Sequence, residues 1–111
     1  MKQNGYALQH ADDSFKKDKK IVLEAVKEYG PALDYADDSL KKDKKIVLEA
    51  VKDYDYGYTL QFADESLKKD KEFILEVVKN NGDAFEWIDE SLKKDADILK
   101  VANENKYKRI L

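Results

Sequence analysis

Residues 30–54 of the chain read GPALDYADDSLKKDKKIVLEAVKDY, and this stretch contains the signals for three successive helical elements. The first element opens with a proline, which the first turn of a helix tolerates because its missing N–H would lack a partner there anyway. A short helix, helix A, is therefore predicted over about residues 31–36. Gly30 is predicted to end the preceding helix, because glycine reaches the left-handed backbone angles of the position after a helix.

Two aspartates in the same stretch mark the starts of the next two elements. Aspartate accepts hydrogen bonds from the unpaired N–H groups at a helix N-terminus. Asp37 is predicted to cap a single linker turn that buries Leu40, and Asp43 to cap a longer helix, helix B, over about residues 44–54. The apolar residues of helix B lie on one broad stripe at helical spacing: Ile46, Val47, Ala50, Val51 and Tyr54. Leu48 widens this stripe, which is typical of a helix packed between two neighbours.

The same unit occurs four times in the chain. Its glycine recurs as Gly5, Gly30, Gly57 and Gly82, at spacings of 25, 27 and 25 residues, and a serine, an aspartate and a lysine pair recur in the same frame. One unit cannot bury its apolar stripe alone, whereas stacked units bury a continuous core. The pattern predicts an all-α solenoid in a single domain, residues 1–111, with repeats at about 5–29, 30–56, 57–81 and 82–106 and an extension at 107–111.

The composition limits the classes of protein to which the chain can belong. Of its residues 42% are hydrophobic and 41% are charged, and the net charge is −3. This balance gives no general attraction to nucleic acid or to an anionic membrane. The chain has no cysteine and one histidine, so neither a disulfide framework nor a cysteine-ligated zinc site is expected. No leader peptide or transmembrane run is visible, and a cytoplasmic protein is expected.

The two ends of the array differ from its interior. Residues 1–5 align with the end of a helix B, so an apolar face is expected to lie open at the N-terminal end and to permit self-association. In the fourth unit, Lys100 and Asn103 replace a leucine and a valine of the earlier units, as expected of a last helix without a following neighbour. Tyr107 replaces the glycine, so the final helix is predicted over about residues 96–108.

The repeat also resembles that of a known family. Gly-x-Ala-Leu-x-x-Ala, as in residues 5–11, precedes Ser-Leu-Lys-x-Asp and Ile-Val-Leu-x-Ala-Val-Lys, as in residues 46–52. As a set, these motifs resemble the short tandem helical repeats of the family called domain of unknown function 4116. The resemblance covers nearly the whole chain and weakens after Asp95. It implies a tandem helical array of uncharacterised role, with no catalytic residues to transfer.

One ring-bearing column of the repeat could bind a ligand. It comprises His10, Tyr35, Phe62 and Trp87. Such rings can stack on a peptide or on unpaired bases. Packing between successive helices A is the favoured interpretation, because equivalent residues of stacked repeats lie in contact.

Lysine clusters recur at the start of each helix B and predict a basic edge. This edge could bind phosphates or an acidic partner. However, an acidic pair lies beside every cluster, and the only arginine is Arg109, although arginine dominates phosphate and base recognition. A solvated face is therefore favoured over a nucleic-acid site. The candidate binding residues of this edge are Lys42, Lys44, Lys45, Lys69 and Lys71.

The third unit begins with an insertion of two residues, Asp55 and Tyr56. Aromatic side chains on loops are typical anchors of protein interfaces, and a lengthened turn at a repeat junction is the alternative. The candidate partner-binding residues of this segment are Tyr54, Asp55, Tyr56 and Tyr58.

Functional motifs are otherwise scarce. No phosphate-binding loop, nucleophile motif or histidine-based dyad is present, and the acidic pairs lack the frame of a calcium loop. No enzyme, cofactor or metal site is expected. The leading hypothesis is a protein–protein interaction module. The alternatives are a nucleic-acid-binding repeat that uses the lysine edge and a structural, self-associating array.

Overall fold

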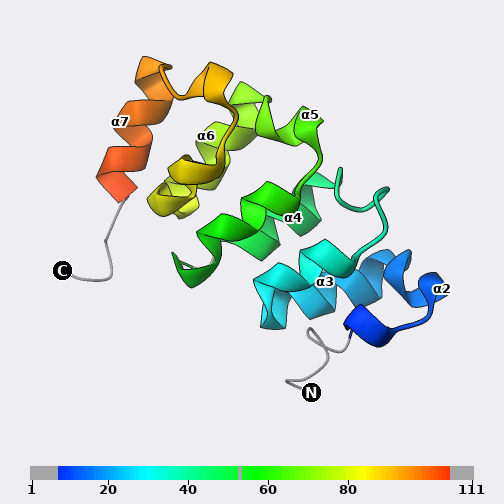
Figure 1. Cartoon of the computed structure of the whole chain (residues 1–111). Coiled ribbons are helices and arrows are strands. Elements are labelled where there is room, and N and C mark those ends of the chain that lie inside the picture. The colour runs from blue at the N-terminus through cyan, green and yellow to red at the C-terminus, as the bar shows by residue number, and fades with distance from the viewer. Residues whose placement is uncertain (1–7, 53, 106–111) are drawn as a thin grey trace.

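The computed structural model describes residues 8–52 and 54–105, and the side chains of residues 54–56 lie outside the described part. The described residues form α-helices, 3-10 helices and turns, without a strand. The predicted all-α repeat fold is therefore confirmed. Helix B of the four units corresponds to α3 (Lys19–Glu28), α4 (Lys44–Val51), α6 (Lys71–Asn80) and α7 (Ala96–Asn105). Figure 1 shows these helices as a row that follows the order of the chain.

Helix A is a 3-10 helix in every unit, which the sequence pattern did not predict. These helices are η1 (Leu8–His10), η2 (Gly30–Tyr35), η3 (Tyr54–Phe62) and η4 (Gly82–Trp87). They contact one another in succession and form a second layer against the α-helices. The linker turns are α2 (Asp13–Lys16), α5 (Glu65–Lys68) and η5 (Glu90–Leu92), and hydrogen-bonded turns replace them in the second unit. Figure 1 places α2 and α5 along the same edge of the array.

The core lies between the two layers and between successive units. The residues that face the following unit from helix B, Val22, Val47 and Ile74, are fully buried. Leu33 and Leu60 are also fully buried and fill the layer of 3-10 helices. The Cα atoms extend over 42 × 31 × 16 Å, so the four units form a short flat slab.

Aspartates begin the helices as the sequence predicts. Asp43 accepts hydrogen bonds from the N–H groups of Lys45 and Ile46 at 2.9 and 3.1 Å. Asp37 accepts from the N–H of Ser39 at 3.0 Å and from its hydroxyl at 2.7 Å, and Leu40 is buried beneath this turn. The paired bonds from Ser39 explain why a serine recurs in every unit.

The insertion before the third unit lengthens helix A and not helix B. The 3-10 helix η3 has nine residues, compared with six each in η2 and η4. The predicted extension of helix B to Tyr54 is wrong, because α4 ends at Val51 and Lys52 follows as its C-cap. The extra residues continue the 3-10 hydrogen bonding of the next element and so leave the register of the core unchanged.

In the described units, the recurring glycine does not have the predicted left-handed conformation. Helices α3 and α6 end because the next residues are extended: Tyr29 has φ −150° and ψ 96°, and Asn81 has φ −151° and ψ 94°. The glycine that follows each of them already belongs to the next 3-10 helix. At Gly57 the requirement is close approach, since a Cβ there would lie 3.2 Å from the backbone nitrogen of Ala84.

The last unit follows the pattern expected of a terminal repeat. Helix α7 is described from Ala96 to Asn105, and residues 106–108 of the predicted helix lie outside the described residues. Lys100 and Asn103 are exposed, as predicted. Leu99 has 38% of its surface exposed, whereas the equivalent residue of every earlier unit is fully buried.

Candidate interaction surface

The first lysine of helix B forms an ion pair with the next unit. The Nζ atom of Lys19 lies 3.0 Å from Oδ2 of Asp43, and that of Lys44 lies 3.3 Å from Oδ2 of Asp70. Lys71 continues the series with Asp95 at 3.0 Å. Each of these aspartates is the N-cap of the following helix B, so one carboxylate both caps its own helix and binds the preceding unit.

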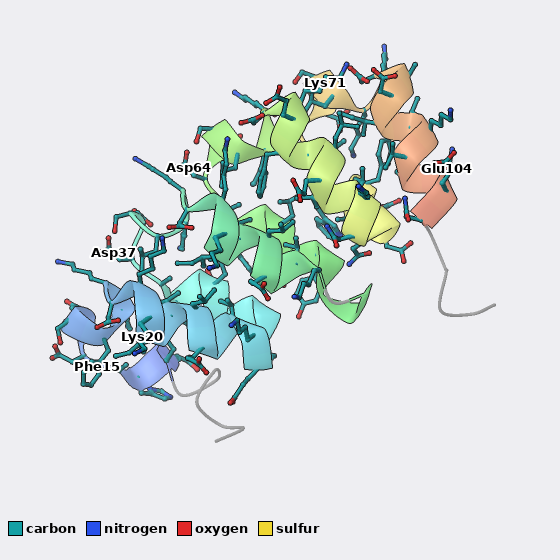
Figure 2. All side chains as sticks on the ribbon, turned by 180° about the vertical axis from the view of Figure 1, so that it is seen from behind. Phe15, Lys20, Asp37, Asp64, Lys71 and Glu104 are labelled. Atoms are coloured by element: carbon teal, nitrogen blue, oxygen red, sulfur yellow. The ribbon has the colours of Figure 1, made fainter. Side chains whose placement is uncertain are left out.

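A backbone hydrogen bond accompanies each ion pair. The N–H of Asp37 donates to the carbonyl of Lys16 at 3.0 Å, and that of Asp64 donates to the carbonyl of Lys41 at 3.0 Å. The N–H of Asp89 donates to the carbonyl of Lys68 in the same way. Figure 2 shows Asp37, Asp64 and Lys71 along one edge of the array. Successive units are therefore joined along this edge by polar contacts outside the apolar core.

The electrostatics of this edge are mixed and not basic. Hydrogen bonds from Ser39, with Lys17 and Lys41 nearby, lower the pKa of Asp37. The pKa of Asp64 is lowered by Ser66 first and then by Lys42 and Lys68. The carboxylates of Asp95 and Asp97 raise the pKa of Lys71.

The candidate lysines of the basic edge are therefore largely used within the array. Lys44 and Lys71 form inter-unit ion pairs, and Lys42 and Lys69 lie close enough to Asp64 and Asp89 to lower their pKa values. Sequence reasoning missed this pairing. A signal for it was present, because Ala96 replaces the lysine in the fourth unit.

The structure separates the lysine edge from the tyrosine-rich insertion. Lys42, Lys44 and Lys45 lie at the N-terminal end of α4, and Lys69 and Lys71 lie at that of α6, whereas Tyr54, Asp55, Tyr56 and Tyr58 belong to η3, beyond the C-terminal end of α4. The eight residues of α4 span about 12 Å. Tyr58 is half-buried.

A groove with a volume of about 360 Å³ lies between α4 and α6. Its apolar lining comes from the half-buried Leu48 and from Phe73, which is 5% exposed. Its charged lining consists of Lys44, Lys45, Glu72 and Glu76. The ion pair of Lys44 with Asp70 lies at one side, while Lys45, Glu72 and Glu76 are exposed.

The groove lies where the charge on the helix B layer changes sign. The residue after the ion-pairing position is lysine in the first two units, Lys20 and Lys45, and acidic in the last two, Glu72 and Asp97. All four are exposed. In the described part of the chain neither Lys20 nor Lys45 has a carboxylate at ion-pair distance. Among the groove residues, sequence reasoning named the two lysines and missed Leu48, Phe73 and the glutamates, because the meeting of α4 and α6 at this position is a tertiary property.

The ring-bearing column is divided between packing and exposure. Tyr35 and Phe62 are half-buried and pack against the core, in agreement with the packing interpretation. In the outer units His10 is exposed and Trp87 has 40% of its surface exposed. The difference arises because an outer unit has a neighbour on one side only.

The described residues contain neither a metal cluster nor a membrane-spanning helix. Between residues 8 and 105, with residue 53 excepted, no three histidine, cysteine or acidic side chains gather as a metal site would require. Across the same part of the chain, no helix has the length and apolar character needed to cross a membrane.

Comparison with known proteins adds a family. The sequence profile described as Domain of unknown function (DUF4116) matches four overlapping segments, residues 1–41, 19–68, 43–93 and 70–108. No curated protein and no solved structure matches the chain significantly. The overlapping matches reproduce the tandem arrangement seen in the fold.

Proposed function

Because the chain belongs to the family described as Domain of unknown function (DUF4116), whose description names no activity, we propose a function from the surface of the chain itself. We propose that it is a protein–protein interaction module without catalytic activity. Its ligand is an amphipathic segment of a protein partner, which inserts apolar side chains into the groove between α4 and α6. The observation that carries the proposal is the apolar groove lined by Leu48 and Phe73 between charged rims.

The dimensions of the groove suit anchoring side chains. Its volume of about 360 Å³ lies at the lower end of the roughly 300–1,000 Å³ of typical ligand pockets. Removing one large apolar side chain from water contributes about 1.5–3 kcal/mol. A partner that inserts two such side chains therefore gains binding energy from contacts to Leu48 and to the exposed edge of Phe73.

The charges around the groove define the polarity of the partner. Lys45 lies on the α4 side of the groove and favours acidic residues of the ligand. Glu72 and Glu76 lie on the α6 side and favour basic residues. Complementary charges of this kind set the orientation of a ligand more than its affinity.

The internal pairing of the lysine edge argues against nucleic acid as the ligand. Phosphate binding requires cations whose counterions are released on association. Lys19, Lys44 and Lys71 already have carboxylate partners within 3.3 Å. Their rearrangement would break the contacts that join successive units.

The test combines capture with site-specific crosslinking. A photoreactive residue replaces Lys45 in the 111-residue chain, and a second variant carries it at Glu86, an exposed residue of the 3-10 layer. Both are irradiated in lysate of the source cells, with and without nuclease. We expect a protein adduct at position 45 in both nuclease arms and none at position 86. The adduct should disappear in a Leu48→Asp background.

Two controls complete this experiment. Circular dichroism establishes that Leu48→Asp folds, and the exchange of exposed charges in Lys45→Glu with Glu72→Lys tests the groove without altering its apolar lining. The same adducts at both positions, or an adduct indifferent to Leu48→Asp in a folded protein, would refute the groove as the docking site. Loss of every adduct on nuclease treatment would instead identify nucleic acid as the ligand.

A further inference from the structure

Every internal junction of the array is built from the same parts. The preceding unit supplies a lysine at the start of its helix B and apolar residues in the column of Val22, Val47 and Ile74. The following unit supplies the capping aspartate of its own helix B and two apolar residues, which are Leu40 and Ile46 in the second unit. These two residues are 9% and 0% exposed. Each junction therefore combines an inter-unit ion pair with buried apolar residues on both units.

The first unit carries the receiving half of such a junction on its outer face. Phe15 and Ile21 occupy the places of Leu40 and Ile46, yet 51% and 37% of their surfaces are exposed. Asp18 caps α3 by accepting from the N–H of Ile21 at 3.1 Å. It has no cation at ion-pair distance in the described part of the chain, whereas its counterparts in the later units each have a lysine. Figure 2 shows Phe15 at the N-terminal end of the array.

The last unit keeps one apolar residue of the donating half, the exposed Leu99 in the column of Val22, Val47 and Ile74, but lacks its other parts. Ala96 stands in the place of the junction lysine, and Asn103 stands in the column that is valine in the earlier units, Val26, Val51 and Val78. Both residues are exposed. A second copy of this chain would therefore bring neither the ion pair nor the complete apolar surface to the N-terminal face. The two ends of the array are therefore complementary only in part.

We infer that the face formed by Phe15, Asp18 and Ile21 is a docking surface for one further helical repeat of the same kind. That repeat has a lysine in the place of Lys19 and valine or isoleucine in the places of Val22 and Val26. Its lysine binds the Asp18 carboxylate, and its apolar residues cover Phe15 and Ile21. The three internal junctions of this chain are the precedent for this geometry.

The probe for this surface is the chain itself with the donating face restored. The donor protein carries Ala96→Lys and Asn103→Val, and Phe15→Ser with Ile21→Ser prevents it from polymerising. The acceptor is the wild-type chain. Sedimentation and fluorescence anisotropy should show a 1:1 complex. A donor that retains Ala96 and Asn103 but carries the two serine substitutions is the matched control and should not bind.

Acceptor variants separate the two contributions to binding. Phe15→Ser in the acceptor should weaken the complex about tenfold or more, because it removes a large apolar contact. Asp18→Asn still caps α3 but loses the charge. It should weaken the complex by about two- to fivefold, the range of an exposed ion pair, and should reduce its salt dependence.

Three outcomes would overturn the inference. One is a donor with wild-type helical content and cooperative unfolding that forms no complex at about 100 µM. A second is wild-type protein that dimerises alone and loses this property on Phe15→Ser, since the occupant would then be a second copy. The third outcome applies if the donor does not fold. The exposed substitution Ala96→Lys is then combined with the two serine substitutions alone, and a folded protein of this kind that does not bind the wild-type chain would overturn the inference.

Discussion

The hydroxyl of Thr59 makes no hydrogen bond, although the side chain lies fully buried in η3. The equivalent residues in the neighbouring units are Ala32 and Ala84, which are also fully buried. A buried polar group without a partner destabilises a protein by about 1–3 kcal/mol relative to its hydrated state. Valine has the branched shape of threonine with a methyl group in place of the hydroxyl. Thr59→Val should therefore remove this penalty and leave the packing intact.

We expect Thr59→Val to raise the free energy of unfolding by about 1–2 kcal/mol, at the lower end of that range because the native state relaxes around the hydroxyl. For a chain of this length the midpoint of thermal unfolding should rise by roughly 3–6 °C per kcal/mol. Urea unfolding at constant pH measures the free energy, and calorimetry measures the midpoint. Thr59→Ser is the matched control, because it keeps the hydroxyl and deletes a buried methyl group. It should destabilise the protein by about 1 kcal/mol.

The reasoning would be refuted if Thr59→Val unfolded at the same or a lower urea concentration than the wild type with an unchanged slope. An unchanged slope excludes an altered unfolded state as the cause. The hydroxyl would then have a partner in solution, and the assignment of Thr59 as an unsatisfied residue would be wrong.

Three other predictions address the junctions, the caps and the insertion. Gly57→Ala should lower the free energy of unfolding, measured by urea titration, by about 1–3 kcal/mol. The reason is that the added Cβ would lie 3.2 Å from both the backbone nitrogen of Ala84 and the Nδ2 atom of Asn81. Equal or greater stability would show that the junction can shift. Serine hydrogen bonds lower the pKa values of capping aspartates such as Asp37. The contribution of these carboxylates to the stability of the fold is therefore complete above the unfolded-state pKa and is lost as the pH falls from about 4 toward 2. Urea midpoints that stay constant from pH 5 to about 2 would contradict this. Tyr56→Ala combined with a Tyr58→Ala substitution tests the insertion as a partner site, and unchanged capture of every protein bound by the wild type would exclude it.

The helical elements can be read from the sequence because their signals are local. Asp43 lies two and three residues before the N–H groups that it caps, and the apolar stripe of α4 follows from the period of an α-helix. Tandem repetition adds a second constraint, because a stripe on every unit can be buried only by stacking. The fold class, the caps and the exposed last helix are therefore properties of the sequence alone.

The conformation of helix A and the path of the insertion are not determined by neighbouring residues in the sequence. The 3-10 helix η2 packs against α3, α4 and η3, and the extended residue Tyr29, rather than Gly30, ends α3. Two inserted residues could lengthen either helix, and they lengthen η3 because this choice preserves the packing of α4 on the core. Such choices depend on contacts between units.

The candidate surfaces also combine features that the sequence shows with features that only the tertiary structure shows. The sequence alone shows a lysine cluster in every unit, and from it a basic edge is a reasonable prediction. Only the tertiary structure places Lys44 beside Asp70 of the next unit and brings Leu48 and Phe73 together in a groove. Residues within one helical turn are related by the geometry of the backbone, which sequence spacing reports. Residues in adjacent units are related by the stacking of one unit on the next, and the core that determines this stacking involves the whole array.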